Sequence, residues 1–142
     1  MQSVRDESGK RYLLLKESGE SSRVRDPETG EERYVANDRL EPVEGESPLV
    51  TAAAAVPESV RTLTSAVRDD RALGLLLELE GRGPTAVRTL LSTYDLCESD
   101  LHGLLAEFRA AGLIEETTVA GERGYGTTPT ASDALAVLRD GE

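Results

Sequence analysis

The chain has 142 residues, which is enough for one domain or two small ones, and its few aromatic residues leave Leu, Val and Ala to fill a core. It has no apolar run of about 18 residues that could span a membrane and no secretory signal at its start, and its single cysteine, Cys97, excludes an internal disulfide. We therefore expect a cytoplasmic protein without a membrane segment, with a formal net charge of −11.

The first 45 residues predict an antiparallel β meander of three or four strands. Short extended runs alternate with turns, and residues 26–30 (DPETG) are the clearest turn because Pro presets φ and Gly accepts a positive φ. A sheet this small is marginal alone, so we expect it to pack on the helical part or on a second copy. Its large apolar side chains are Tyr12, Leu13, Leu14, Leu15, Val24, Tyr34, Val35 and Leu40.

The acidic segment 41–48 predicts a linker, because it carries two prolines and a glycine. We therefore divide the chain into a small β meander, residues 1–46, and a second domain, residues 47–142. Beyond the linker, a short Ala-rich helix is expected over 49–56 and an amphipathic helix over 58–67.

The order of elements in residues 69–128 is that of a winged helix-turn-helix. A leucine-rich helix over 71–80 ends at a Gly-Arg-Gly-Pro break, and a short second helix follows. The third helix has apolar residues at helical spacing, and two strands flank the turn at residues 120–124. The predicted fold class is α+β: an N-terminal antiparallel β meander followed by a winged helix-turn-helix domain that ends in a helix over 129–138.

Three sequence motifs carry a resemblance to a known family: DRALGLLL from residue 70, LLAEFRAAGLI from residue 104 and GYGTTPTA from residue 124. Together they resemble the winged-helix regulators of the ArsR and MarR type. The resemblance implies a homodimeric transcriptional regulator that binds double-stranded DNA with its third helix and its wing. The whole chain also resembles a member of an uncharacterised haloarchaeal family, to which no function is attached.

The same resemblance implies which side chains face the nucleic acid. The exposed face of the third helix would contact bases, a wing arginine would enter a groove and the second helix would face the backbone. Further phosphate contacts could come from Arg82 and Arg109. The predicted DNA-binding residues are Arg88, Ser99, His102, Gly103 and Arg123.

Two carboxylates on the third helix favour an alternative function. Glu98 and Asp100 would repel phosphates, although a carboxylate can accept a hydrogen bond from cytosine N4 and also complements the positive end of a helix dipole. The alternative is a winged-helix module that binds another protein and no DNA.

Neither a metal site nor a catalytic site is expected. The segment Leu96 to Leu101 resembles the metal motif of arsenic-sensing repressors, but Ser99 stands where that motif has its second cysteine. Cys97 is interpreted as a buried or capping residue. The sole histidine, His102, has no nucleophile at a recognisable spacing, and the glycines of residues 121–126 lack the lysine of a phosphate-binding loop. We therefore expect no enzyme and no cofactor.

The charge pattern resembles that of cytoplasmic proteins from salt-in halophiles. Acidic residues number 27, and only two of the 16 basic residues are lysines. At molar salt the Debye length falls to about 3 Å, so repulsion among surface carboxylates is screened. In an ordinary mesophile the same charge would be a strong argument against DNA binding.

This halophilic interpretation predicts that the chain folds only at high salt. Circular dichroism across a KCl series should show a poorly folded chain in dilute buffer and a compact fold in molar KCl, because screening relieves self-repulsion. A cooperative fold that is equally stable at about 50 mM and about 1 M KCl would contradict the halophilic interpretation.

Overall fold

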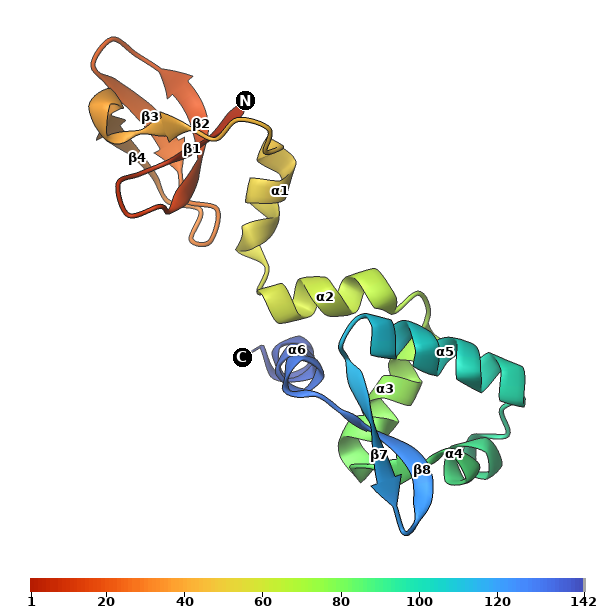
Figure 1. Ribbon diagram of the computed structural model, residues 1–142. Helices are drawn as coiled ribbons and strands as arrows, with labels where there is room; N and C mark the ends of the chain where they lie inside the picture. Colours follow the sequence, from red (N-terminus) through yellow and green to blue (C-terminus); the bar gives the residue numbers. More distant parts are fainter. Residues whose placement is uncertain (142) are drawn as a thin grey trace. The chain divides into compact units, whose positions relative to one another are not determined.

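The computed structural model describes residues 1–141, and the chain divides into two compact units, Met1–Pro57 and Glu58–Glu142 (Figure 1). Each unit has a sheet and a buried core of its own. The domain boundary expected after residue 46 stays a prediction.

A five-stranded antiparallel sheet forms most of the first unit. Its order is β4-β3-β2-β1-β5, so the chain meanders as far as β4 and then returns to pair β5 with β1. This fifth strand, absent from the predicted meander, lies inside the segment expected to be linker. The strands are β1 (Gln2–Arg5), β2 (Arg11–Glu17), β3 (Ser21–Arg25), β4 (Glu32–Ala36) and β5 (Glu41–Pro42), with a 3-10 turn, η1 (Asn37–Arg39), before β5.

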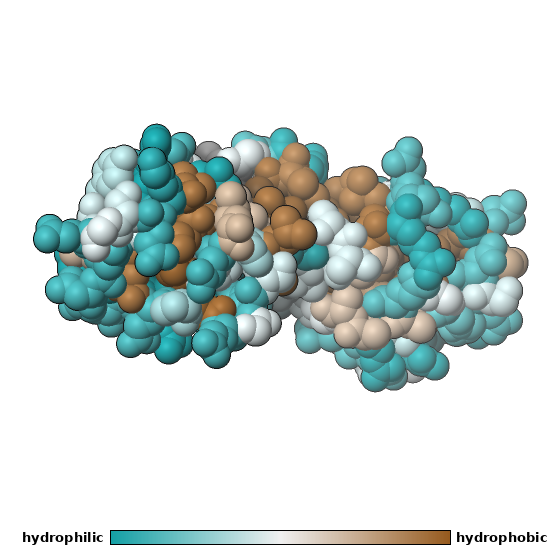
Figure 2. Space-filling view, turned by 90° about the horizontal axis from the view of Figure 1, so that it is seen from above, coloured by the Kyte–Doolittle hydropathy of each residue, from teal (hydrophilic) through white to brown (hydrophobic). Residues whose placement is uncertain are grey.

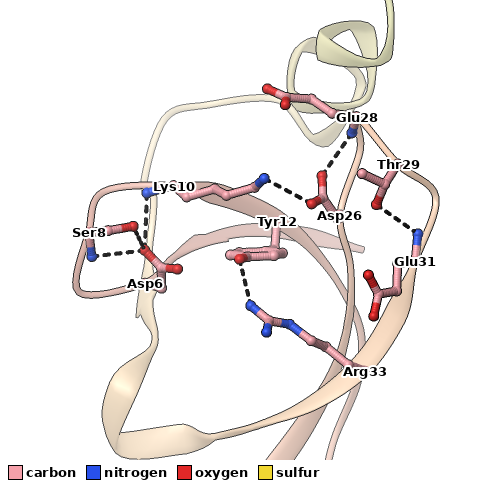
Figure 3. Close-up of polar contacts among 9 residues, drawn as sticks. All are labelled: Asp6, Ser8, Lys10, Tyr12, Asp26, Glu28, Thr29, Glu31 and Arg33. Carbon is pink, nitrogen blue, oxygen red and sulfur yellow. Dashed lines mark hydrogen bonds and ion pairs between the residues drawn. The ribbon is translucent and has the colours of Figure 1, made fainter.

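Tyr12 is the centre of the small core of this unit. Its ring is buried with two valines, and Arg33 donates a hydrogen bond of 2.7 Å to its hydroxyl (Figure 3). Lys10 lies over the same ring and forms a 2.8 Å ion pair with Asp26, which lowers the pKa of Asp26. These contacts tie the turn after β1 to the turn after β3.

Tyr34 lies outside this core, contrary to its place among the predicted apolar side chains. Side chains alternate between the two faces of a strand, so the inward position of Val35 turns Tyr34 outward. Tyr34 is 65% exposed. The sequence pattern missed this because a tyrosine fits either face of a half-buried strand.

A short helix, α1 (Pro48–Ala52), packs on β1 and β2 and is followed by a 3-10 turn, η2 (Ala53–Ala55). Ser47 caps α1 by accepting a hydrogen bond from the Leu49 amide. On the packed side, the buried hydroxyls of Ser3 and Thr51 are hydrogen-bonded at 2.6 Å. Leu49 is an exposed apolar residue. Figure 2 shows a face on which hydrophobic residues interrupt a largely hydrophilic surface.

The second unit contains five helices and a three-stranded sheet in the order β6-β8-β7. Helices α2 and α6 pack against each other, and α5 packs against β7. The helices are α2 (Glu58–Ala66), α3 (Asp70–Arg82), α4 (Val87–Tyr94), α5 (Glu98–Ala110) and α6 (Pro129–Asp140). The strands are β6 (Thr85–Ala86), β7 (Ile114–Val119) and β8 (Glu122–Thr127).

Apolar residues at helical spacing build one core in this unit. The Asp69 carboxylate caps α3 by accepting from the Ala72 amide at 2.8 Å, and the Thr128 hydroxyl caps α6. The largest of its most buried side chains come from α3, α4, α5 and the residue before β7. They are Leu76, Leu79, Leu90, Leu101, Leu105, Phe108 and Leu113. Helix α6 adds Ala131, Ala134 and Leu135.

The order α3-β6-α4-α5-β7-β8, with β8 between the other two strands, is that of a winged helix-turn-helix. Asp95 adopts a left-handed conformation at the turn between α4 and α5. The predicted α+β class, a β meander followed by this domain, is confirmed.

Gly124 is predicted to be indispensable to the wing. A methyl group there would lie 2.5 Å from the Thr85 carbonyl oxygen, so Gly124→Ala must push β8 away from β6. We expect a loss of about 1–3 kcal/mol in the free energy of unfolding, measured by denaturant titration. Gly74→Ala in α3 meets open space and should instead stabilise by about 0.5–1 kcal/mol. Equal stability of the two variants would contradict the tight approach of β6 and β8.

Candidate nucleic-acid interface

Helix α5 is the third helix of the winged helix-turn-helix, after α3 and α4, and carries three of the predicted site residues. Cys97 stands at its N-cap position, two carboxylates lie in its first turn and Arg109 in its last. Leu101, Leu105 and Phe108 are buried, which leaves Ser99, His102 and Gly103 on the exposed side. The predicted orientation of this helix is therefore what the structure shows.

The wing is a short hairpin made by β7 and β8. Ala120 and Gly121 form its turn with φ values of +50° and +80°, which gives a tight two-residue connection. Arg123 pairs with Thr118 on the strand and so lies past the turn, not at the tip. The residue that borders the turn is the acidic Glu122.

A groove of about 540 Å³ separates the C-terminal half of α5 from the wing. His102 and Arg109 line it from the helix, and Arg123 and Tyr125 line it from β8. The floor is small or apolar, with Leu105 and two alanines of α5. Three nitrogen-bearing side chains from two elements thus face one open channel.

Glu116 on β7 holds the two arginines of this groove. Its carboxylate oxygens lie 3.3 Å from Arg109 Nη1 and 3.6 Å from Arg123 Nε. Arg123 also donates a hydrogen bond of 2.7 Å to the Tyr125 hydroxyl, and this bond raises the pKa of Arg123. Both arginines are therefore held where they line the groove, but the shared Glu116 carboxylate partly neutralises their positive charges.

The remaining predicted residues lie elsewhere. Ser99 and Gly103 line a second groove on another side of α5, together with Arg68 and Arg71. Arg88 on α4 is exposed and pairs with Glu122 beside the wing turn, at 3.5 Å. The structure therefore brings His102 and Arg123 together and separates them from the other three.

Carboxylates accompany the cations around α5. His102 Nε2 lies 3.6 Å from Glu98, and Arg68 pairs with Glu107 across the second groove. Arg71 donates to Asp100 at 3.0 Å, a bond that lowers the pKa of Asp100, with a further contribution from Cys97. Both members of most of these pairs are partly exposed, so each pair contributes little to stability.

Cys97 is exposed and makes no cap hydrogen bond, unlike the buried or capping residue that was expected. Its sulfur lies 3.5 Å from the Ser99 hydroxyl. Within residues 1–141, no group of three or more His, Cys, Asp or Glu side chains is arranged to hold a metal ion. No helix in that range is long and apolar enough to cross a membrane.

Sequence reasoning missed Glu116 and Tyr125 as parts of the groove. Both lie on strands, and they are directly opposite each other in the register of β7 and β8. The pairing of these strands places Glu116 near Arg123, and the packing of α5 on β7 places it near Arg109. The pattern Gly-Tyr-Gly in β8 was the available signal, because Gly124 and Gly126 are closely approached by Thr85 and Pro84 and so mark a tightly packed strand around Tyr125.

The sequence matches a family of unknown function (DUF7346) over residues 1–139, and the chain therefore belongs to this family. No protein with a curated description matches it. Among solved structures, it is similar to the crystal structure of the transcriptional regulator HlyU from Vibrio vulnificus CMCP6, at 20% identity and a TM-score of 0.49. That alignment covers 63% of this chain and 95% of the other. The fold assignment rests instead on the element order and strand pairing given above.

The pair of Arg71 and Asp100 predicts a measurable titration. Arg71→Gln should raise the pKa of Asp100 toward its ordinary value near 3.8, followed by NMR of the carboxyl carbon. Because the folded pKa is depressed, the pair stabilises the fold above that ordinary value and loses its effect as pH falls through the folded pKa. Arg68→Gln is the matched control and should leave Asp100 unchanged. An equal response to both substitutions would contradict the direct bond.

Proposed function

We propose that this member of the DUF7346 family is a DNA-binding transcriptional regulator. In this proposal α5 enters a groove of double-stranded DNA, and the channel between α5 and the wing follows one sugar-phosphate backbone. The observation that carries the proposal is the convergence of His102, Arg109 and Arg123 on that channel, next to the exposed face of the helix. Phosphate oxygens are the groups that such a set of donors binds best.

Exchange of partners explains how paired arginines could still bind a phosphate. Glu116 is 42% exposed in its side chain, and the two arginines that it holds are 56% exposed. Ion pairs this open to solvent are worth about 0–1 kcal/mol, so a phosphate can replace the carboxylate at small cost. Arg109 and Arg123 then need no large movement to reach the backbone.

The exposed face of α5 supports close approach to bases. Ser99 is short, and nothing lies within 4 Å of the position that a side chain on Gly103 would take. His102 can donate or accept a hydrogen bond at a base edge. We therefore keep Ser99, His102 and Gly103 as base-facing residues and Arg88 as a backbone contact beside the wing.

A homodimer completes the proposal. One winged helix-turn-helix has few basic groups that could contact phosphates. A symmetric dimer would double their number and place them on two half-sites. Such a regulator would act where the genome is, in the cytoplasm of a cell without a nucleus.

A second candidate is a winged-helix module that binds a basic protein instead of DNA. The observation in its favour is the set of carboxylates along α5, namely Glu98, Asp100 and Glu107. A basic partner would gain from the same charges that repel phosphates.

The salt dependence of DNA binding tests the channel. With a labelled mixed-sequence duplex of about 30 base pairs, we expect Arg109→Ala and Arg123→Ala each to weaken binding by about 1 kcal/mol and to reduce the salt slope by about one. The titration starts at the lowest KCl concentration at which circular dichroism shows the folded chain. Arg139→Ala on α6 removes the same charge outside the channel and should leave both quantities unchanged.

Genome-wide crosslinking and immunoprecipitation in the native host decides between the two candidates. Discrete peaks over promoters that disappear in the Arg109→Ala/Arg123→Ala double variant would support the regulator. Absence of peaks in the unmodified chain, together with capture of a basic protein that Glu98→Gln and Asp100→Asn abolish, would replace it with the interaction module.

A further inference from the structure

On one face of the first unit's sheet, cations of β2 and β3 lie beside an exposed tyrosine of the edge strand β4. Directly opposite residues of antiparallel strands share a face, and the register aligns Lys16 of β2, Arg23 of β3 and Tyr34 of β4 in one row. Arg25 lies two residues along β3, so it points to the same side. We call these four residues the Tyr34 face.

The opposite side of the same strands is the core. Ser22 and Val24 of β3 are buried, and Val35 of β4 packs against that core. On the side of the Tyr34 face, α1 covers the sheet at β1, where Thr51 meets Ser3. Within the first unit, the part over β3 and β4 stays open.

The charges on the Tyr34 face differ from those of the rest of the unit. Within residues 1–141, Lys16 and Arg25 have no ion-pair partner, and Arg23 has one exposed partner, Glu32, at 2.9 Å. The other cations of this unit are paired. Arg5, Lys10, Arg11 and Arg39 each bind a carboxylate, and Arg33 bonds the Tyr12 hydroxyl.

The chain has a formal net charge of −11, so a cation without an ion-pair partner contrasts with the mostly negative electrostatic potential of this protein. A local positive patch with a flat ring at one end, on the edge strand β4, matches a polyanion that carries flat rings. An exposed aromatic side chain stacks on an unpaired base regardless of sequence, while neighbouring Lys and Arg side chains bind the phosphates. A base inside a duplex is stacked on both sides and cannot use the ring.

We propose that the Tyr34 face binds single-stranded nucleic acid. One base stacks on the ring of Tyr34, and the flanking phosphates contact Lys16, Arg23 and Arg25. The pair of Arg23 and Glu32 is exposed on both sides, so a phosphate replaces the carboxylate at small cost. This site is separate from the channel beside α5 and does not depend on duplex binding there.

Fluorescence anisotropy with labelled oligo-dT and oligo-U of about 12 nucleotides tests the site. The full-length Arg109→Ala/Arg123→Ala chain is the parent, so that the channel contributes nothing. Tyr34→Ala should weaken binding about 5-fold or more, and Tyr34→Phe should retain it because the ring remains. Lys16→Gln and Arg25→Gln should each weaken binding and lower the salt slope. Comparison of the two oligonucleotides shows whether DNA or RNA is preferred.

Arg5→Gln is the matched control, because it removes one exposed cation from another strand of the same sheet. It should bind as the parent does, and circular dichroism must show every variant folded. Three results would each overturn the proposal: no binding of either oligonucleotide by the parent, unchanged binding by Tyr34→Ala, or a duplex bound as tightly as the single strand. If the parent chain no longer binds a duplex but still binds the oligonucleotides, then this site acts separately from the proposed regulator function.

Discussion

Ion pairs between many carboxylates and a small number of arginines set the surface character of the second unit. Residues 58–142 contain eight arginines and fifteen acidic residues. The arginines that line the two grooves of α5 all form ion pairs with carboxylates of neighbouring elements. Such exposed pairs stabilise the fold weakly, and they keep the guanidinium groups in defined positions.

The apolar core fixes where these pairs can form. Leu101, Leu105 and Phe108 orient α5, while the absence of a side chain at Gly124 lets β8 approach β6 closely. The strand register then places Glu116 opposite Tyr125 and within reach of α5. A surface made of weak interactions therefore depends on a few close contacts in the interior.

The cations of the first unit are arranged differently from those of the second unit. Most of its cations are paired around the rim of the sheet, and Tyr12 binds Arg33 and lies under Lys10. Among the described residues 1–141, Lys16 and Arg25 have no ion-pair partner on one face, beside the exposed ring of Tyr34. Helix α1 covers the other face of the sheet at β1, and Arg23 and Tyr34 lie exposed on the part over β3 and β4.

The sequence by itself determined the helices of the winged unit and the inward face of α5, because apolar residues at helical spacing and local turn signals are properties of neighbouring residues. It also indicated the β meander, although not its fifth strand, since the pairing of β5 with β1 joins segments far apart in the chain. Two of the five predicted site residues, His102 and Arg123, meet in one groove, and the others do not. Which carboxylate holds which arginine, and which face Tyr34 occupies, was decided by tertiary structure alone, because strand register and helix packing bring together side chains that no local pattern connects.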